Sequence, residues 1–169
     1  MCDRFRLAAE AVGAVIKHFS CIGEARDYLM GIAGGGAVSC STLPTHLRDA
    51  LAIDASGTAV PADAVLCISR AEAGIAATGS LLIDLKGPEG RAATALAPIH
   101  AVFLDPTTIV PTLYDLGERL NRMLTSGDQA YFSLTTGPSR TADIERVLTI
   151  GVHGPIELHI LMIEGCCHE

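Results

Sequence analysis

The chain has 169 residues, 49% of them hydrophobic and 18% charged, which predicts one folded domain, residues 1–169, with a buried core. Its formal net charge of −7 and its two lysines, Lys17 and Lys86, argue against nucleic-acid binding, which needs clustered basic residues. No stretch approaches the roughly 20 apolar residues of a membrane span, so no membrane association is expected.

The first half of the chain predicts alternating helices and strands. Phe5, Ala8, Ala9 and Val12 recur on one side of a helical turn and indicate the first helix. The expected elements are a helix over 3–12, a strand over 14–19, a helix over 23–32, a strand over 37–41 and a helix over 43–51. The segment 54–63 contains Gly, Ser and Pro and is expected to be a surface loop.

The second half continues the alternation. An apolar run predicts a buried strand over 64–69, and leucines at helical spacing predict an amphipathic helix over 112–124. Also expected are strands over 80–85, 100–104, 130–135 and 156–163, a turn or short helical piece over 72–77, and a turn over 87–90. The pattern predicts an α/β fold: a single domain with a mixed, mostly parallel sheet flanked by helices.

The six cysteines are dispersed, and no secretion signal is recognisable, so reduced thiols and a cytoplasmic location are expected. The tail from Cys166 to Glu169 has metal-ligand residue types without the spacing of a zinc site. There is no phosphate-loop lysine motif, dinucleotide glycine fingerprint or iron–sulfur cysteine spacing. Neither a bound metal nor a cofactor is therefore expected.

The segment from Thr135 to Glu145 is the first candidate ligand loop, because it follows a strand and ligands bind where strands end in α/β sheets. Arg140 offers a planar guanidinium for a carboxylate or phosphate, and Gly137 frees the backbone for close approach. The other candidate residues are Ser139 and Thr141 as ligand-binding hydroxyls, and Asp143 and Glu145 as catalytic acids. Alternatively, Ser139 or Thr141 caps a helix that starts near Ala142, and Arg140 pairs with Asp143.

Two further loops are candidates. His153 lies between glycines in the segment 151–155 and is a candidate acid–base group, or else a histidine whose ring hydrogen-bonds a neighbouring loop. Thr78, Gly79 and Ser80 could bind a ligand's oxygens through hydroxyls and amides, or else Gly79 ends a helix. His100 is expected to be structural.

These segments resemble those of a known family. The segment 137–145 (GPSRTADIE), followed by 151–155 (GVHGP), resembles the paired C-terminal signature of the LUD domain family, to which lactate-utilisation protein C belongs. Upstream, 75–80 (IAATGS) and 96–100 (LAPIH) are similar to family segments in the same order. One departure is Ala77, where the family usually has Glu or Gln, and Glu72 does not obviously replace that side chain.

The resemblance implies a fold like that of sugar-phosphate isomerases and CoA transferases. It also implies a role in the oxidation of L-lactate to pyruvate beside iron–sulfur partner proteins, with a small carboxylate or phosphate bound in the cleft. Two alternatives stay open: a stand-alone enzyme acting on a phosphorylated or acyl molecule, and a binding protein that has lost turnover. Whether the chain is itself an enzyme is left open. The low charge and small apolar residues are compatible with a homodimer.

Overall fold

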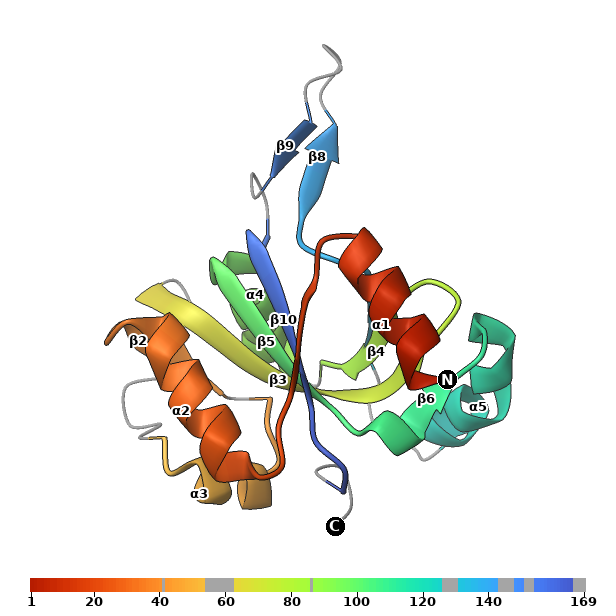
Figure 1. The fold of residues 1–169 in the computed structure, drawn as a ribbon, viewed down its shortest axis with the longest axis horizontal. Coiled ribbons are helices and arrows are strands. Elements are labelled where there is room, and N and C mark those ends of the chain that lie inside the picture. Colours follow the sequence, from red (N-terminus) through yellow and green to blue (C-terminus); the bar gives the residue numbers. More distant parts are fainter. Residues whose placement is uncertain are drawn as a thin grey trace.

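The computed structural model describes residues 1–40, 42–53, 63–85, 87–125, 131–142, 148–150 and 154–165. The described residues form an eight-stranded mixed sheet with helices on both faces (Figure 1) and a separate two-stranded hairpin. The expected α/β class and mostly parallel sheet are therefore confirmed. Within these residues, no helix combines the length and hydrophobicity needed to cross a membrane.

The helices and strands have the following bounds. The helices are α1 (Cys2–Ala11), α2 (Ile22–Ala33), α3 (Thr45–Leu51), α4 (Gly87–Leu96) and α5 (Gly117–Thr125), with 3-10 turns η3 (Pro106–Thr108) and η4 (Leu113–Leu116). The strands are β1 (Val15–His18), β2 (Ala37–Ser39), β3 (Ala64–Ile75), β4 (Ser80–Asp84), β5 (Ile99–Leu104), β6 (Ile109–Val110), β7 (Phe132–Thr135), β8 (Arg140–Ala142), β9 (Leu148–Ile150) and β10 (Glu157–Met162).

Strand β3 connects the parallel part of the sheet to its antiparallel part. Its first part pairs in parallel with β2 and β5, and β5 continues in parallel through β10 to β1. A register shift between Ala71 and Ala73 then bends the strand, and its last residues pair antiparallel with β4, which in turn pairs with β7. The hairpin of β8 and β9 stands away from this sheet (Figure 1).

The two faces of the sheet are covered by different helices. On one face, α2 and α3 bury residues such as Leu29 and Leu47 against Ile68 and Phe103. On the other face, α1 packs Phe5 and Ala9 against the sheet, and α4 packs beside it through small residues. Burial of each large apolar side chain contributes about 1.5–3 kcal/mol, so both faces stabilise the fold.

Two local predictions were wrong, over 72–77 and over 87–90. Residues 72–77 continue β3 up to Ile75, because small residues let that strand be buried on both sides. Residues 87–90 begin α4, since a proline in the first turn of a helix, here Pro88, loses no hydrogen bond. The helix expected over 112–124 is present, but its first residues form the 3-10 turn η4 before α5 begins at Gly117. Arg140–Ala142 form β8, and the residues that directly follow, where the alternative helix near Ala142 would lie, are outside the described part of the chain. The loop expected over 54–63 lies outside the described residues except for Asp63.

Candidate functional site

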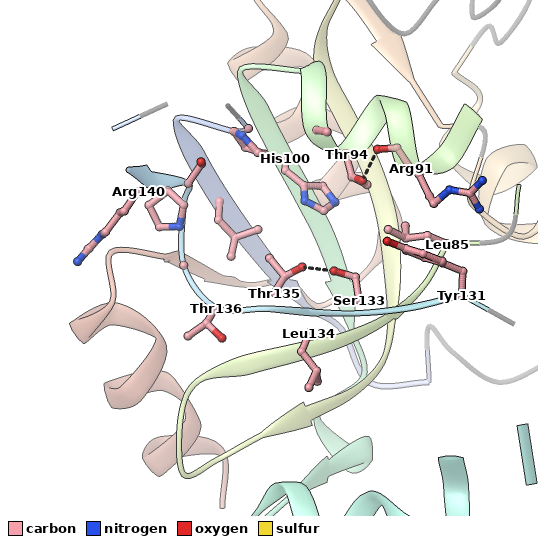
Figure 2. A pocket seen from close by; sticks show the side chains of 17 residues that line it. Leu85, Arg91, Thr94, His100, Tyr131, Ser133, Leu134, Thr135, Thr136 and Arg140 are labelled. Atoms are coloured by element: carbon pink, nitrogen blue, oxygen red, sulfur yellow. Dashed lines mark hydrogen bonds between the residues drawn. The ribbon is translucent and has the colours of Figure 1, made fainter. Parts of the chain in front are cut away.

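A cleft of about 480 Å³ lies on the face covered by α1 and α4 (Figure 2). It is bounded by α4, by the first residues of β5 and β10, and by β7 with the residues that follow it. Its lining residues are Leu85, Arg91, Thr94, Ala95, His100, Tyr131, Ser133, Leu134, Thr135, Thr136, Gly137, Pro138, Ser139, Arg140, Gly154, Pro155 and Leu158. The cleft therefore meets the carboxyl end of β7, but the amino ends of β5 and β10.

The described lining of this cleft contains no aspartate or glutamate. This is unusual in a chain with a formal net charge of −7. The Arg91 guanidinium lies over the Tyr131 ring, 4.9 Å from its centroid, a distance at which a cation is attracted to the ring. Arg91, Thr94 and Ala95 share one side of α4 because they are three and four residues apart, so the helix presents this cation to the cleft.

His100 lies at the base of the cleft and is only 2% exposed (Figure 2). Its Nε2 is 2.7 Å from the hydroxyl oxygen of Ser69, which is fully buried on β3. Burial lowers the pKa of His100 to about 4, because a charged imidazole loses its hydration there. The ring is thus neutral at pH 7, and only one of its two nitrogens is bonded to a described residue. The expectation of a structural histidine accounts for Nε2 alone.

The segment containing Thr78, Gly79 and Ser80 is the tight turn between β3 and β4, not the end of a helix. The hydroxyl groups of this turn form a hydrogen-bonded chain that ends at the cleft wall. Thr78 Oγ1 lies 2.7 Å from Ser80 Oγ, and Ser80 Oγ lies 2.7 Å from Thr136 Oγ1. Only Thr136 of these three lines the cleft. The Thr78 segment therefore supports the wall from behind.

Gly79 lets α1 approach this turn. Its φ is +66°, and a Cβ built there would lie 2.3 Å from the backbone nitrogen of Ala9. No side chain fits in that space, so the glycine fixes how closely α1 packs on the turn. Ala77, the departure from the family pattern, is exposed in the same turn and does not line the cleft.

Arg140 contributes to the lining, but its guanidinium points away from the other labelled side chains (Figure 2). Its Nη2 donates to the Val12 carbonyl oxygen at 2.7 Å, just beyond the last residue of α1. A cation at that position satisfies an unpaired carbonyl and complements the negative end of the helix dipole. Gly137 adjoins the same carbonyl, since a Cβ there would lie 2.5 Å from Val12 O.

The two parts of the predicted signature meet at the cleft. The backbone N–H of Ser139 donates to the Pro155 carbonyl oxygen at 2.8 Å, and Gly154 lies against the Ser139 side chain. Of the other predicted residues, Asp143, Glu145 and His153 lie outside the described residues, and for Thr141 only the backbone, in β8, is described. In the part of the chain that the structure describes, no three His, Cys, Asp or Glu side chains come together as metal ligands.

The sequence prediction missed Arg91, Tyr131 and Ser133, and it included Thr135 in the first candidate loop without assigning it a role. The spacing of Arg91, Thr94 and Ala95 is the one signal that could have identified the α4 side of the cleft, but it is informative only once that helix is known. Ser133 and Thr135 alternate along β7, and their hydroxyl oxygens lie 3.3 Å apart. Their alternation is typical of any strand that has one polar side.

The fold is similar to that of a solved protein. The crystal structure of a DUF162 family protein from Deinococcus radiodurans matches with a TM-score of 0.68, covering 96% of this chain and 95% of that one, at 18% sequence identity. At this identity the match is evidence of a shared fold.

Sequence comparisons identify relatives and the family. The Escherichia coli protein YkgG is 33% identical over 98 residues, which cover 57% of this chain and 42% of YkgG. Lactate utilization protein C from Bacillus pumilus is 34% identical over 92 residues, which cover 53% of this chain and 38% of the relative. The matches thus span about two fifths of the relatives' length. Residues 58–163 match the LUD domain. Because this match covers more than half of the chain, the protein belongs to the LUD domain family.

Proposed function

We propose that this protein binds a small organic anion in the cleft. The observation that carries the proposal is the placement of Arg91 in a cleft whose described lining has no acidic side chain, within a chain of net charge −7. The net negative charge of the chain repels anions on average, whereas in this cleft an anion meets a cation and hydroxyl groups. The signature segments form part of the same wall.

We propose further that the anion is a carboxylate, and that the protein acts in the oxidation of L-lactate to pyruvate together with iron–sulfur partner proteins. Several relatives bear the name lactate utilization protein C, which supports the pathway. A guanidinium binds a carboxylate through two parallel hydrogen bonds, which suits Arg91. The Ser133 and Thr135 hydroxyls are available to bind further oxygens of the ligand.

The binding test is a calorimetric titration with L-lactate and with pyruvate. Arg91→Gln should weaken binding of both by at least about tenfold, because it removes a charge-assisted hydrogen-bonding group. The matched control is Arg122→Gln, since Arg122 is exposed on α5 and does not line the cleft. Equal affinities for Arg91→Gln and the unsubstituted protein would refute the proposed site.

The pathway is tested separately by growth. A host that lacks its own copy of this gene should recover growth on L-lactate with the unsubstituted chain and with Arg122→Gln, but poorly with Arg91→Gln. Growth on glucose serves as the control for general fitness. Full recovery by Arg91→Gln would argue against a role of the cleft in lactate oxidation.

The size of the cleft favours a second candidate function. Clefts of about 300–1,000 Å³ hold drug-sized ligands, and 480 Å³ is several times the space that a three-carbon acid fills. A stand-alone enzyme acting on a phosphorylated or acyl molecule would use this room. The same titration with sugar phosphates and CoA esters distinguishes the two: binding that depends on Arg91 and is much tighter than that of lactate would favour the second candidate.

A further inference from the structure

His100 has one ring nitrogen committed to the protein and the other not bonded to any described residue. Nε2 pairs with Ser69, and both residues are buried, at 2% and 0% exposure. Nδ1 is not one of the fully enclosed polar atoms that lack a partner in the described residues, so it is reachable from the cleft. His100 also lines the cleft, with its ring turned into the space between α4 and β7 (Figure 2). The cleft is therefore where a partner for Nδ1 is to be found.

The pairing with Ser69 lets His100 offer either hydrogen-bonding role. A serine hydroxyl both donates and accepts, and a neutral imidazole carries its proton on one nitrogen or the other. When Ser69 donates to Nε2, Nδ1 carries the proton and donates. When Ser69 accepts from Nε2, Nδ1 accepts. A carbonyl oxygen and a hydroxyl group can each be bound in this way, with no change in the charge of the cleft.

Arg91 and His100 belong to neighbouring elements, because α4 leads through Ala97 and Pro98 into β5. Only Arg91 of these two is charged at neutral pH, so Arg91 can hold the charged group of a ligand while His100 binds an uncharged polar group. We infer that His100 is a specificity-determining residue that binds a carbonyl or hydroxyl oxygen of an anion whose charged group is held by Arg91. The inference rests on the proposed anion binding in the cleft.

The test compares three acids with equal numbers of carbon atoms. L-lactate has a 2-hydroxyl, pyruvate has a 2-oxo group, and propionate has neither, while all three carry the same carboxylate. The unsubstituted protein should bind lactate and pyruvate about tenfold more tightly than propionate, which is the effect of one hydrogen bond in a buried site. In His100→Phe the three affinities should converge on that of propionate.

A double variant guards against a folding defect. His100→Phe alone leaves the Ser69 hydroxyl buried without its partner, whereas His100→Phe with Ser69→Ala removes both polar groups together and disturbs the fold less. Unchanged propionate binding in the double variant shows that Arg91 and the cleft are intact. Discrimination that persists in the double variant would overturn the inference.

A spectroscopic measurement reports on the ring itself. With ¹⁵N-labelled histidine, the Nδ1 resonance of His100, assigned by its loss in His100→Phe, should shift on addition of lactate or pyruvate and stay unchanged with propionate. A purely structural histidine would respond to none of the three acids, and that result would overturn the inference. Equal binding of all three acids would also overturn it while leaving the proposed function in place. Failure of all three to bind would remove both.

Discussion

Two buried histidines on neighbouring strands show how the faces of the sheet differ. His159 on β10 faces α2, where its Nδ1 lies 2.7 Å from the Tyr28 hydroxyl and its Nε2 lies 2.8 Å from Glu157 Oε2. His100 on β5 faces the opposite side, where Ser69 binds one nitrogen only. Both rings are nearly inaccessible, at 4% and 2% exposure. Burial alone therefore does not separate a structural histidine from a candidate ligand-binding one, whereas the count of bonded nitrogens does.

The comparison extends to the helices that cover each face. Helix α2 closes its face with large side chains such as Leu29, and this cluster continues into α3. On the other face, α1 is held by close backbone approaches, at Gly79 and at Gly137, and the cleft opens beside it. Both faces contribute stability by packing, and the open face in addition leaves space for a ligand beside α1.

The largest effect is expected from a side chain placed where α1 meets the β3–β4 turn. Gly79→Ala should destabilise the protein by about 4 kcal/mol, because the new Cβ meets the Ala9 backbone and the left-handed φ adds strain. The measurement is urea unfolding. Gly34→Ala is the matched control, since Gly34 also has a positive φ but has no atom near the new Cβ, and it should cost only about 1–2 kcal/mol. Equal losses of stability in Gly79→Ala and Gly34→Ala would show that the close approach of α1 to Gly79 does not stabilise the protein.

How much of the fold and of the cleft could be predicted from the sequence depends on whether a local residue pattern reports on them. Apolar runs and helical periodicity located most elements, because those patterns follow from burial on one face. The helix α4 was missed because Gly87, Pro88 and Gly90 resemble a turn, and Arg91 was missed with it. Gly137, Ser139 and Arg140 of the signature are among the residues that line the cleft, but the sequence does not show that the Arg140 guanidinium reaches α1. That contact spans 128 positions of the chain and depends on the fold.

The second prediction concerns the pH dependence of stability that the buried His100 should cause. The pKa of His100 falls from 6.5 to about 4 on folding, so between these values the unfolded chain binds more protons than the folded one. Stability should therefore be complete above about pH 6.5 and should fall, by at most roughly 3 kcal/mol, as the pH drops towards 4. Urea unfolding across pH 4–8 measures the slope.

The control for that slope is the double variant His100→Phe with Ser69→Ala, which titrates no imidazole at this position. Its stability should change less between pH 6.5 and 4 than that of the unsubstituted protein. Carboxylates that titrate in the same range contribute equally to both proteins and cancel in the difference. Identical slopes would mean that His100 is not buried in solution.

The third prediction addresses the closed face. Tyr28→Phe removes the hydroxyl that pairs with Nδ1 of His159, and it should cost about 1–2 kcal/mol because a buried ring nitrogen loses its partner. Tyr114→Phe is the control, since Tyr114 is 96% exposed and its variant should leave the free energy of unfolding unchanged. Ligand affinity should be the same in both variants. A change in lactate binding by Tyr28→Phe would break the assignment of separate roles to the two faces.

The smallest effect is expected at Arg140, where the structure distinguishes a helix cap from an anion clamp. Arg140→Gln should lower the free energy of unfolding by about 1 kcal/mol, because the side chain is exposed and the bond to Val12 O is a single one. Arg140→Gln should leave the affinity for L-lactate and pyruvate nearly unchanged. Arg91→Gln should weaken that affinity and leave the free energy of unfolding nearly unchanged. Measuring unfolding and binding in both variants therefore identifies which arginine holds the ligand. If Arg140→Gln abolished binding without destabilising the protein, its guanidinium would have to leave α1 when the anion enters, and the cleft would be completed only by the ligand.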